Sequence, residues 1–156
     1  MTRLIELVMQ LRRLAESIPY SVCALLARAA IAGIFWRAAS TKLANFDLTI
    51  ALFQDEYLRN VSFLPAAPMA YLATAIEITM PALIVVGLMT RLATLPLIGM
   101  TIFIQLFVYP TSWPDHLIWI ALLTLLLSRG AGAISADALL ARFFGRGAQM
   151  HMPHTS

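Results

Sequence analysis

Two ionisable side chains, Arg28 and Glu77, lie in the middle of long apolar stretches, where a charge is costly unless it is paired or functional. At about 1.5 Å per helical residue, Arg28 lies about 15 Å from the start of its stretch at Ile18. Glu77 lies about 14 Å from the opposite side, on a stretch that begins near Pro68. The two side chains are therefore expected at similar depth, and we predict that they form a buried ion pair.

Pro81 makes the position of Glu77 more demanding, because proline has no N–H and the carbonyl of Glu77 loses its helical partner. Neighbouring helices must then satisfy both the carbonyl and the carboxylate. A buried arginine binds anions and a buried glutamate relays protons, so the pair is a candidate anion, quinone or proton site. The alternative is a structural ion pair that fixes the order of the helices, and the sequence leaves both interpretations open.

Further polar residues fall toward the opposite half of the expected membrane region. Gln105 and Tyr109 follow one helical face, and Asp115 and His116 open the next apolar stretch. Together with Lys42 and Asp47 they are candidates to line a cavity, although each is also an ordinary helix-end or interface residue. The predicted buried polar site comprises Arg28, Glu77, Lys42, Gln105, Tyr109 and His116.

The C-terminal tail carries side chains that suit copper. Thioether and imidazole groups alternate at Met150, His151, Met152 and His154, and His151, Met152 and His154 are the candidate metal ligands. The alternative is a disordered tail with no metal. The single cysteine, Cys23, excludes an intramolecular disulfide and a Cys-x-x-Cys motif. The sequence has no phosphate-binding loop, dinucleotide fingerprint, Ser-His-Asp order or paired-His metal motif, so any enzyme activity needs a partner or a lipid-soluble cofactor.

Composition identifies the elements that must position these residues. The chain has 156 residues, of which 60% are hydrophobic and 12% charged, and its mean hydropathy is +0.80. Four apolar tracts are each close to the roughly 20 residues that cross a bilayer core. We predict an all-α membrane protein, an antiparallel four-helix transmembrane bundle in one domain over residues 1–149, with a disordered tail at 150–156. The expected spans cover about residues 18–39, 70–88, 92–109 and 113–129.

Arginine and lysine residues near the expected spans predict the orientation. Seven of them fall on one side and three on the other. The positive-inside rule then places both termini in the cytoplasm, in a multi-pass protein of the bacterial inner membrane. A small-residue pair, Ala29 and Gly33, allows close helix approach and a homodimer. We expect no nucleic-acid partner, because the basic residues flank the spans.

Amphipathic helices are expected outside the spans. Apolar residues recur at helical spacing over residues 4–18, which predicts a basic amphipathic helix on the inner membrane surface. Between the first two spans a second helix is expected to begin at Asp47 as its N-cap and to end at Leu64-Pro65. A third is expected after the fourth span, with Ser135 as its N-cap and Gly145 as its terminator.

The order of these features resembles the DoxX family of small four-helix membrane proteins. The resemblance covers roughly residues 26–140. It rests on Arg28 with Gly33 and Phe35, Thr41-Lys42-Leu43, Glu77, Gly87-Leu88-Met89-Thr90-Arg91, and the closing Gly130-x-Gly132-x-x-Ser135-x-Asp137. The family commonly has proline where Ala131 stands here. The resemblance implies membrane redox chemistry, which in some members is a quinone-linked subunit of thiosulfate oxidation.

One branch of the family is more similar still. FDLTIALFQDEY, YLATAIEITMPALIVVGLMTRLATLPLIGM and FVYPTSWPDHLIW are similar to members found beside copper-inducible, cysteine-rich modified (bufferin-like) peptides and their iron-dependent modifying enzymes. This resemblance implies a setting in copper or metal stress, with a protein partner in a redox or peptide-modification system.

Three functional hypotheses follow. The first is an accessory membrane subunit of a redox system, either quinone-linked or serving copper or metal stress, with quinone or copper as the implied cofactor. The second is a small transporter or exporter in which Arg28 and Glu77 couple protons. The third is a membrane anchor that recruits soluble enzymes and needs the two residues for folding alone.

Overall fold

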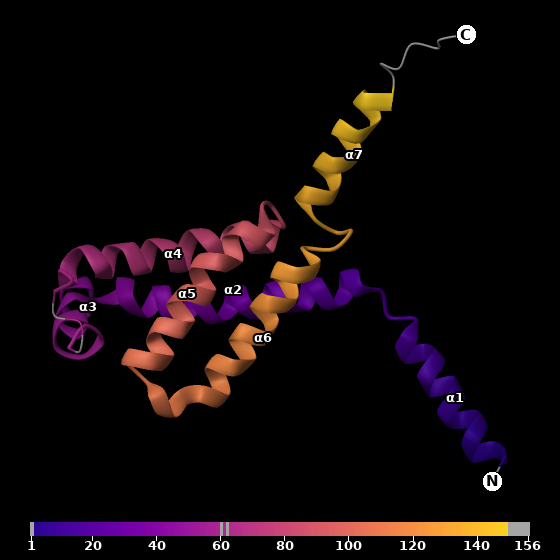
Figure 1. Cartoon of the computed structure of the whole chain (residues 1–156), viewed down its shortest axis with the longest axis horizontal. Coiled ribbons are helices and arrows are strands. Elements are labelled where there is room, and N and C mark those ends of the chain that lie inside the picture. The colour runs from indigo at the N-terminus through magenta and orange to yellow at the C-terminus, as the bar shows by residue number, and fades with distance from the viewer. Residues whose placement is uncertain (1, 60, 62, 150–156) are drawn as a thin grey trace.

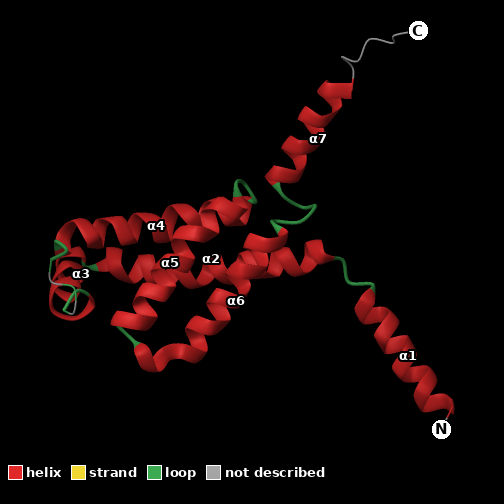
Figure 2. Cartoon of the chain, viewed as in Figure 1, coloured by secondary structure: helices red, strands yellow, loops and turns green. Residues whose placement is uncertain are grey.

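The computed structural model describes residues 2–59, 61 and 63–149, and these residues contain helices and no strand (Figures 1 and 2). The helices in chain order are α1 (Thr2–Glu16), α2 (Tyr20–Ala44), α3 (Phe46–Leu52), the π-helical turn η1 (Phe53–Tyr57), α4 (Ala66–Val86), α5 (Thr90–Phe107), the 3-10 turn η2 (Pro110–Ser112), α6 (Trp113–Arg129) and α7 (Ala136–Gln149).

Helices α2, α4, α5 and α6 form an antiparallel bundle (Figure 1). Helix α2 packs against α4 and α6, and α5 packs against α4 and α6. Small buried residues on α2, such as Ala24 and Ala27, let the backbones approach closely. Ile31, Ile84, Leu97, Leu123 and Leu126 fill the centre. We call the end where α2 begins and α6 finishes the terminal end, and the opposite end the far end.

Within the described part of the chain three helices, α2, α4 and α5, are long and apolar enough to cross a membrane. The chain is therefore a multi-pass membrane protein. Helix α6 has 17 residues and runs antiparallel beside α5, so its role as a fourth span stays a prediction, as does the orientation of the bundle. The first span is longer than expected, because α2 continues to Ala44 before Asn45 ends it.

Helices α1 and α7 both leave the terminal end and extend away from the bundle (Figure 2). Apolar side chains of α1, including Leu4, Val8 and Leu11, are exposed, as expected for a helix that lies on a membrane surface. Ser135 caps α7 as predicted, since its hydroxyl accepts a hydrogen bond from the Ala138 amide at 3.1 Å. The predicted stop at Gly145 is wrong, because α7 continues to Gln149.

The segment after α2 folds back onto α4. Asn45, rather than the predicted Asp47, is the N-cap of α3, and its side-chain oxygen accepts from the Leu48 amide at 3.0 Å. The helical structure ends at Tyr57, before the predicted Leu64. Its apolar face packs against α4 around Ala70 and Met69. This segment therefore covers the far end of the gap between α4 and α5.

Candidate functional site

Glu77 forms its ion pair with Lys42, on α2. The Lys42 Nζ atom lies 2.8 Å from both carboxylate oxygens of Glu77. The Glu77 side chain is 3% exposed and that of Lys42 is 15% exposed. An uncompensated carboxylate at this depth would be costly, so the lysine makes the position of Glu77 tenable. Next to it, the indole N–H of Trp36 donates to the Ile78 carbonyl at 3.2 Å, in the turn that Pro81 disturbs.

The predicted pair of Arg28 with Glu77 is wrong. Side chains on a helix lean toward its N-terminus, so Arg28 and Lys42 on α2 both lean toward the terminal end. This tilt directs the Arg28 side chain away from Glu77. Lys42 lies about 21 Å further along the helix, and the same tilt directs its side chain back toward the carboxylate. Residue counting gave similar depths for Arg28 and Glu77 but did not include the direction in which each side chain extends.

Arg28 is 3% exposed and donates only to backbone carbonyls among the described residues. Its Nε donates to Ile84 at 2.7 Å and its Nη2 donates to Val85, both in the last turns of α4. Its Nη1 donates to Ala131 at 3.2 Å and Ile134 at 2.6 Å, in the linker between α6 and α7. Each of the three guanidinium nitrogens therefore has a partner, and Arg28 joins α2, α4 and this linker.

The residues around Arg28 form a close joint at the terminal end. Gly87 ends α4 with φ +74, and a Cβ there would lie 2.5 Å from the Cβ of Ser135 and 3.0 Å from Arg28 Nη2. Asp137 crosses from α7 to the start of α5, where its carboxylate accepts from the Met89 amide at 2.8 Å and the Thr90 amide at 3.3 Å. These contacts explain why only glycine fits at position 87.

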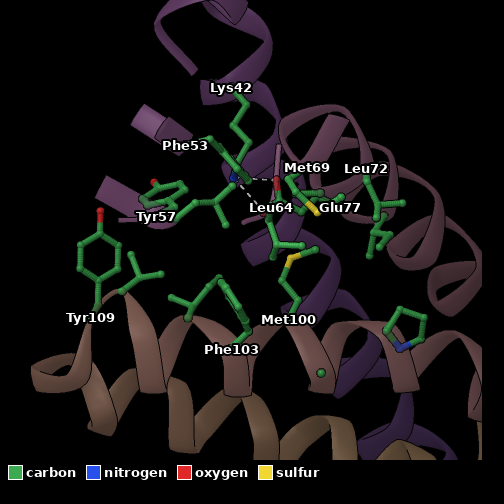
Figure 3. Close-up of a pocket in the computed structure, with 17 residues that line it drawn as sticks. Lys42, Phe53, Tyr57, Leu64, Met69, Leu72, Glu77, Met100, Phe103 and Tyr109 are labelled. Atoms are coloured by element: carbon green, nitrogen blue, oxygen red, sulfur yellow. Dashed lines mark hydrogen bonds and ion pairs between the residues drawn. The ribbon is translucent and has the colours of Figure 1, made fainter. Parts of the chain in front are cut away.

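A cavity of about 380 Å³ lies between α4 and α5, and the Lys42–Glu77 pair borders it (Figure 3). Its walls are mostly apolar. Met69 and Leu72 come from α4, Met100 and Phe103 from α5, and Phe53 from η1. Such an arrangement, an apolar space with one ion pair at its edge, is typical of sites for small apolar ligands that carry a polar head.

Tyr57 and Tyr109 border the same cavity at its far end, with ring centroids 6.0 Å apart. Tyr109 lies just beyond the end of α5. Burial, together with the nearby Glu56 and Tyr57, raises the pKa of the Tyr109 phenol above its ordinary value. A tyrosine phenol is protonated at neutral pH in any case, and this one is already hydrogen-bonded with Glu56 and Tyr57.

The structure divides the predicted polar site into separate places. Lys42, Glu77 and Tyr109 line the cavity, and Arg28 lies at the terminal joint. His116, which is 3% exposed, pairs instead with Gln105, whose side-chain oxygen lies 2.6 Å from the imidazole Nδ1. Gln105 also donates to the Pro110 carbonyl at 2.8 Å, so these two residues connect α5, η2 and α6 outside the cavity.

The sequence did not single out the apolar residues that shape the cavity. Phe53 and Tyr57 fall in the segment predicted as an amphipathic helix between the first two spans, but that prediction did not say what its apolar side covers. Gly99 and Met100 lie on α5 and appear in the sequence as ordinary members of an apolar span. Gly99 leaves open space in front of its Cα, with no atom within 4 Å of where a Cβ would be. Gly33 on α2 has the same open space but does not line the cavity, so a glycine inside a span does not by itself indicate a cavity.

Metal binding by the described residues has no structural support, because they contain no group of three or more His, Cys, Asp or Glu side chains that could hold an ion. The candidate ligands His151, Met152 and His154 lie outside the described residues. Cys23 is exposed on α2.

The DoxX family model matches residues 23–110. The matched range includes Arg28, Lys42 and Glu77 and covers more than half of the 156 residues. No curated protein and no solved structure matches the chain. The family match thus agrees with the resemblance noted in the sequence, and this chain belongs to the DoxX family.

Proposed function

We propose that this protein is the membrane subunit of a redox system and that it binds the head group of a membrane quinone in the cavity between α4 and α5. The observation that carries the proposal is the Lys42–Glu77 pair at the edge of that apolar cavity. Among the described residues no other charged side chain lines the cavity, so the pair fixes where a polar head group would be recognised.

The size and lining of the cavity fit a quinone ring. Its volume of about 380 Å³ lies within the range of roughly 300–1,000 Å³ that is usual for small-molecule sites. The Met100 and Phe103 side chains supply apolar surface for a flat ring. The Lys42 ammonium has three N–H donors, of which Glu77 occupies two, so a quinone carbonyl can accept the third.

The position of the cavity suits a ligand that arrives from the bilayer. Leu72 of α4 and Gly99 of α5 line the cavity and are also exposed at the surface of two helices that are long enough to span the membrane. An isoprenoid tail can leave between these helices into lipid. Tyr109 lines the far end of the same cavity.

Electrons must come from a partner protein with its own redox cofactor, since the sequence has no motif for a soluble cofactor. We propose that this partner belongs to a redox or peptide-modification system. A role in copper stress is the setting that the sequence resemblance favours for this subunit. The test of this role is whether copper changes the expression of the protein and the amount of quinone that it binds.

The test compares two glycines that both have open space in front of them. A Cβ at Gly99 or at Gly33 would meet no atom within 4 Å, but only Gly99 lines the cavity. Gly99→Ile should therefore fill part of the cavity, and Gly33→Ile should not. Quinone is extracted from each purified full-length variant and quantified per mole of protein.

We expect Gly99→Ile to lower bound quinone about tenfold, which corresponds to about 1.4 kcal/mol of binding free energy. Gly33→Ile should retain the wild-type amount, and size-exclusion chromatography checks that both variants keep the same oligomeric state. Equal quinone content in all three proteins, or no quinone in the wild type after gentle purification and reloading, would refute the proposal.

A further inference from the structure

A second pocket, of about 560 Å³, lies at the terminal end of the bundle and is separate from the quinone cavity. It is formed where the turn between α4 and α5 meets the end of α6, the linker that follows, and the start of α7. Because this is the level at which the helices leave the bilayer, the pocket faces lipid head groups and solvent.

Two arginines converge on this pocket. Arg91 donates from Nη2 to the Ser128 carbonyl at 3.2 Å, and its Nε lies beside Gly130. Arg129 lies over the ring of Tyr20, with 5.6 Å between its Cζ and the ring centroid. The hydroxyl of Tyr20 donates to the Gly130 carbonyl at 2.8 Å, so both guanidinium groups are held around one point of the backbone.

Among the described residues, one carboxylate, that of Asp137, lines the pocket with the two arginines, so the charged lining carries one net positive charge. Asp137 accepts backbone hydrogen bonds with both oxygens, from the amides of Met89 and Thr90. Within the part of the chain that the structure describes, neither Arg91 nor Arg129 has a carboxylate partner. The described lining therefore carries two arginines and one carboxylate whose oxygens already accept from the backbone, and an anion in the pocket would balance the remaining positive charge.

Thr90, which also lines this pocket, provides independent evidence for a ligand. Its side chain is completely buried, and its hydroxyl has no hydrogen-bond partner among the described residues. Buried hydroxyl groups nearly always have a partner, because leaving one unsatisfied is costly. A ligand oxygen in the pocket would accept the missing hydrogen bond.

From this arrangement we infer that the pocket binds an anionic phosphate group, held by Arg91 and Arg129 and hydrogen-bonded by Thr90. Guanidinium groups match the geometry of phosphate oxygens and bind them in a bidentate manner. The phosphate belongs either to the head group of an anionic phospholipid in the leaflet at the terminal end or to free phosphate. The site is distant from the quinone cavity, and its function does not depend on quinone binding.

The experiment measures binding of phosphatidylglycerol and phosphatidylcholine to the delipidated full-length protein by native mass spectrometry. Three variants are compared with the wild type: Thr90→Val, the double variant Arg91→Gln/Arg129→Gln, and the control Arg142→Gln. Arg142 is an exposed arginine on α7 that does not line the pocket, so its loss changes the net charge at the same end without touching the site.

We expect the wild type to prefer phosphatidylglycerol. Loss of one hydrogen bond to a charged group should weaken that binding about tenfold in Thr90→Val, and more in the double variant. Arg142→Gln should bind as the wild type does. Thr90→Val also keeps the test valid if the arginine variants fold poorly, because it removes an unsatisfied hydroxyl and should melt at the same or a higher temperature than the wild type without lipid.

Unchanged binding in Thr90→Val and the double variant, or an equal loss in Arg142→Gln, would each overturn the inference. The source of the phosphate is identified by adding inorganic phosphate. Displacement of the lipid at millimolar phosphate supports a site for free phosphate, and retention of the lipid supports a head-group site.

Discussion

Arg28 and Lys42 lie on the same helix, both are cations inside the bundle, and both reach α4, yet their surroundings differ. Arg28 donates to four backbone carbonyls at the terminal joint. Lys42 pairs with a carboxylate at the edge of a cavity. A cation whose donors are all taken up by the backbone holds helices together, whereas a cation beside open space can also bind a ligand. The charge of a residue in a membrane helix therefore does not by itself identify a functional site.

The largest expected loss of stability follows substitution of Arg28. Arg28→Met removes the donors of four carbonyls and should destabilise the protein by on the order of 3–5 kcal/mol, because buried acceptors lose their partners. Unfolding in a denaturing detergent titration measures the change. Arg37→Met, at an exposed position of the same helix, is the control and should cost less than about 0.5 kcal/mol. A native-like stability for Arg28→Met would contradict a structural role.

A smaller loss of stability is expected when a side chain is added at the terminal joint and the hydrogen bonds of Arg28 are kept. Gly87→Ala should cost about 2–4 kcal/mol, because alanine is strained at a φ of +74 and its Cβ would approach the Cβ of Ser135 to 2.5 Å. Gly99→Ala controls for the exchange itself and should leave stability unchanged or raise it, since its Cβ meets no atom within 4 Å. Equal effects of the two exchanges would show that the joint is not tightly packed.

The smallest expected effect on stability is at the cavity. Lys42→Met and Glu77→Gln should each cost about 1–3 kcal/mol, since Lys42 is partly exposed and the remaining partner can adjust. The double variant should cost less than the sum of the two, with a coupling of about 1 kcal/mol or more. The same unfolding titration gives all three values. Additive losses would mean that the two side chains do not depend on each other.

The helices of the bundle could be predicted from the sequence because apolar tracts of membrane length have few alternatives. Helix ends were harder to predict, since α2 and α7 both continue past the expected stops at residue 39 and Gly145. At these positions tertiary packing and local propensity compete within a few residues, and the pattern of apolar residues does not decide between them.

The partners of the polar residues were less predictable, because they depend on how each helix is rotated. Gln105 and Tyr109 share a face by spacing, yet Gln105 contacts His116 of α6 while Tyr109 borders the cavity. The joint around Arg28 brings together Gly87, Ser135 and Asp137, which are up to about 110 residues away along the chain. These residues are among those on which the sequence resemblance rests, but their order along the chain does not show that they are in contact.

The most direct test of the account compares quinone content with stability in the same samples. Arg28→Lys is set against the double variant Lys42→Met/Glu77→Gln, each as full-length protein in native-lipid particles. We predict that Arg28→Lys loses stability but keeps its bound quinone, and that the double variant keeps more of its stability but loses the quinone. The opposite result, with quinone lost from Arg28→Lys and retained by the double variant, would contradict the assignment of the cavity as the functional site.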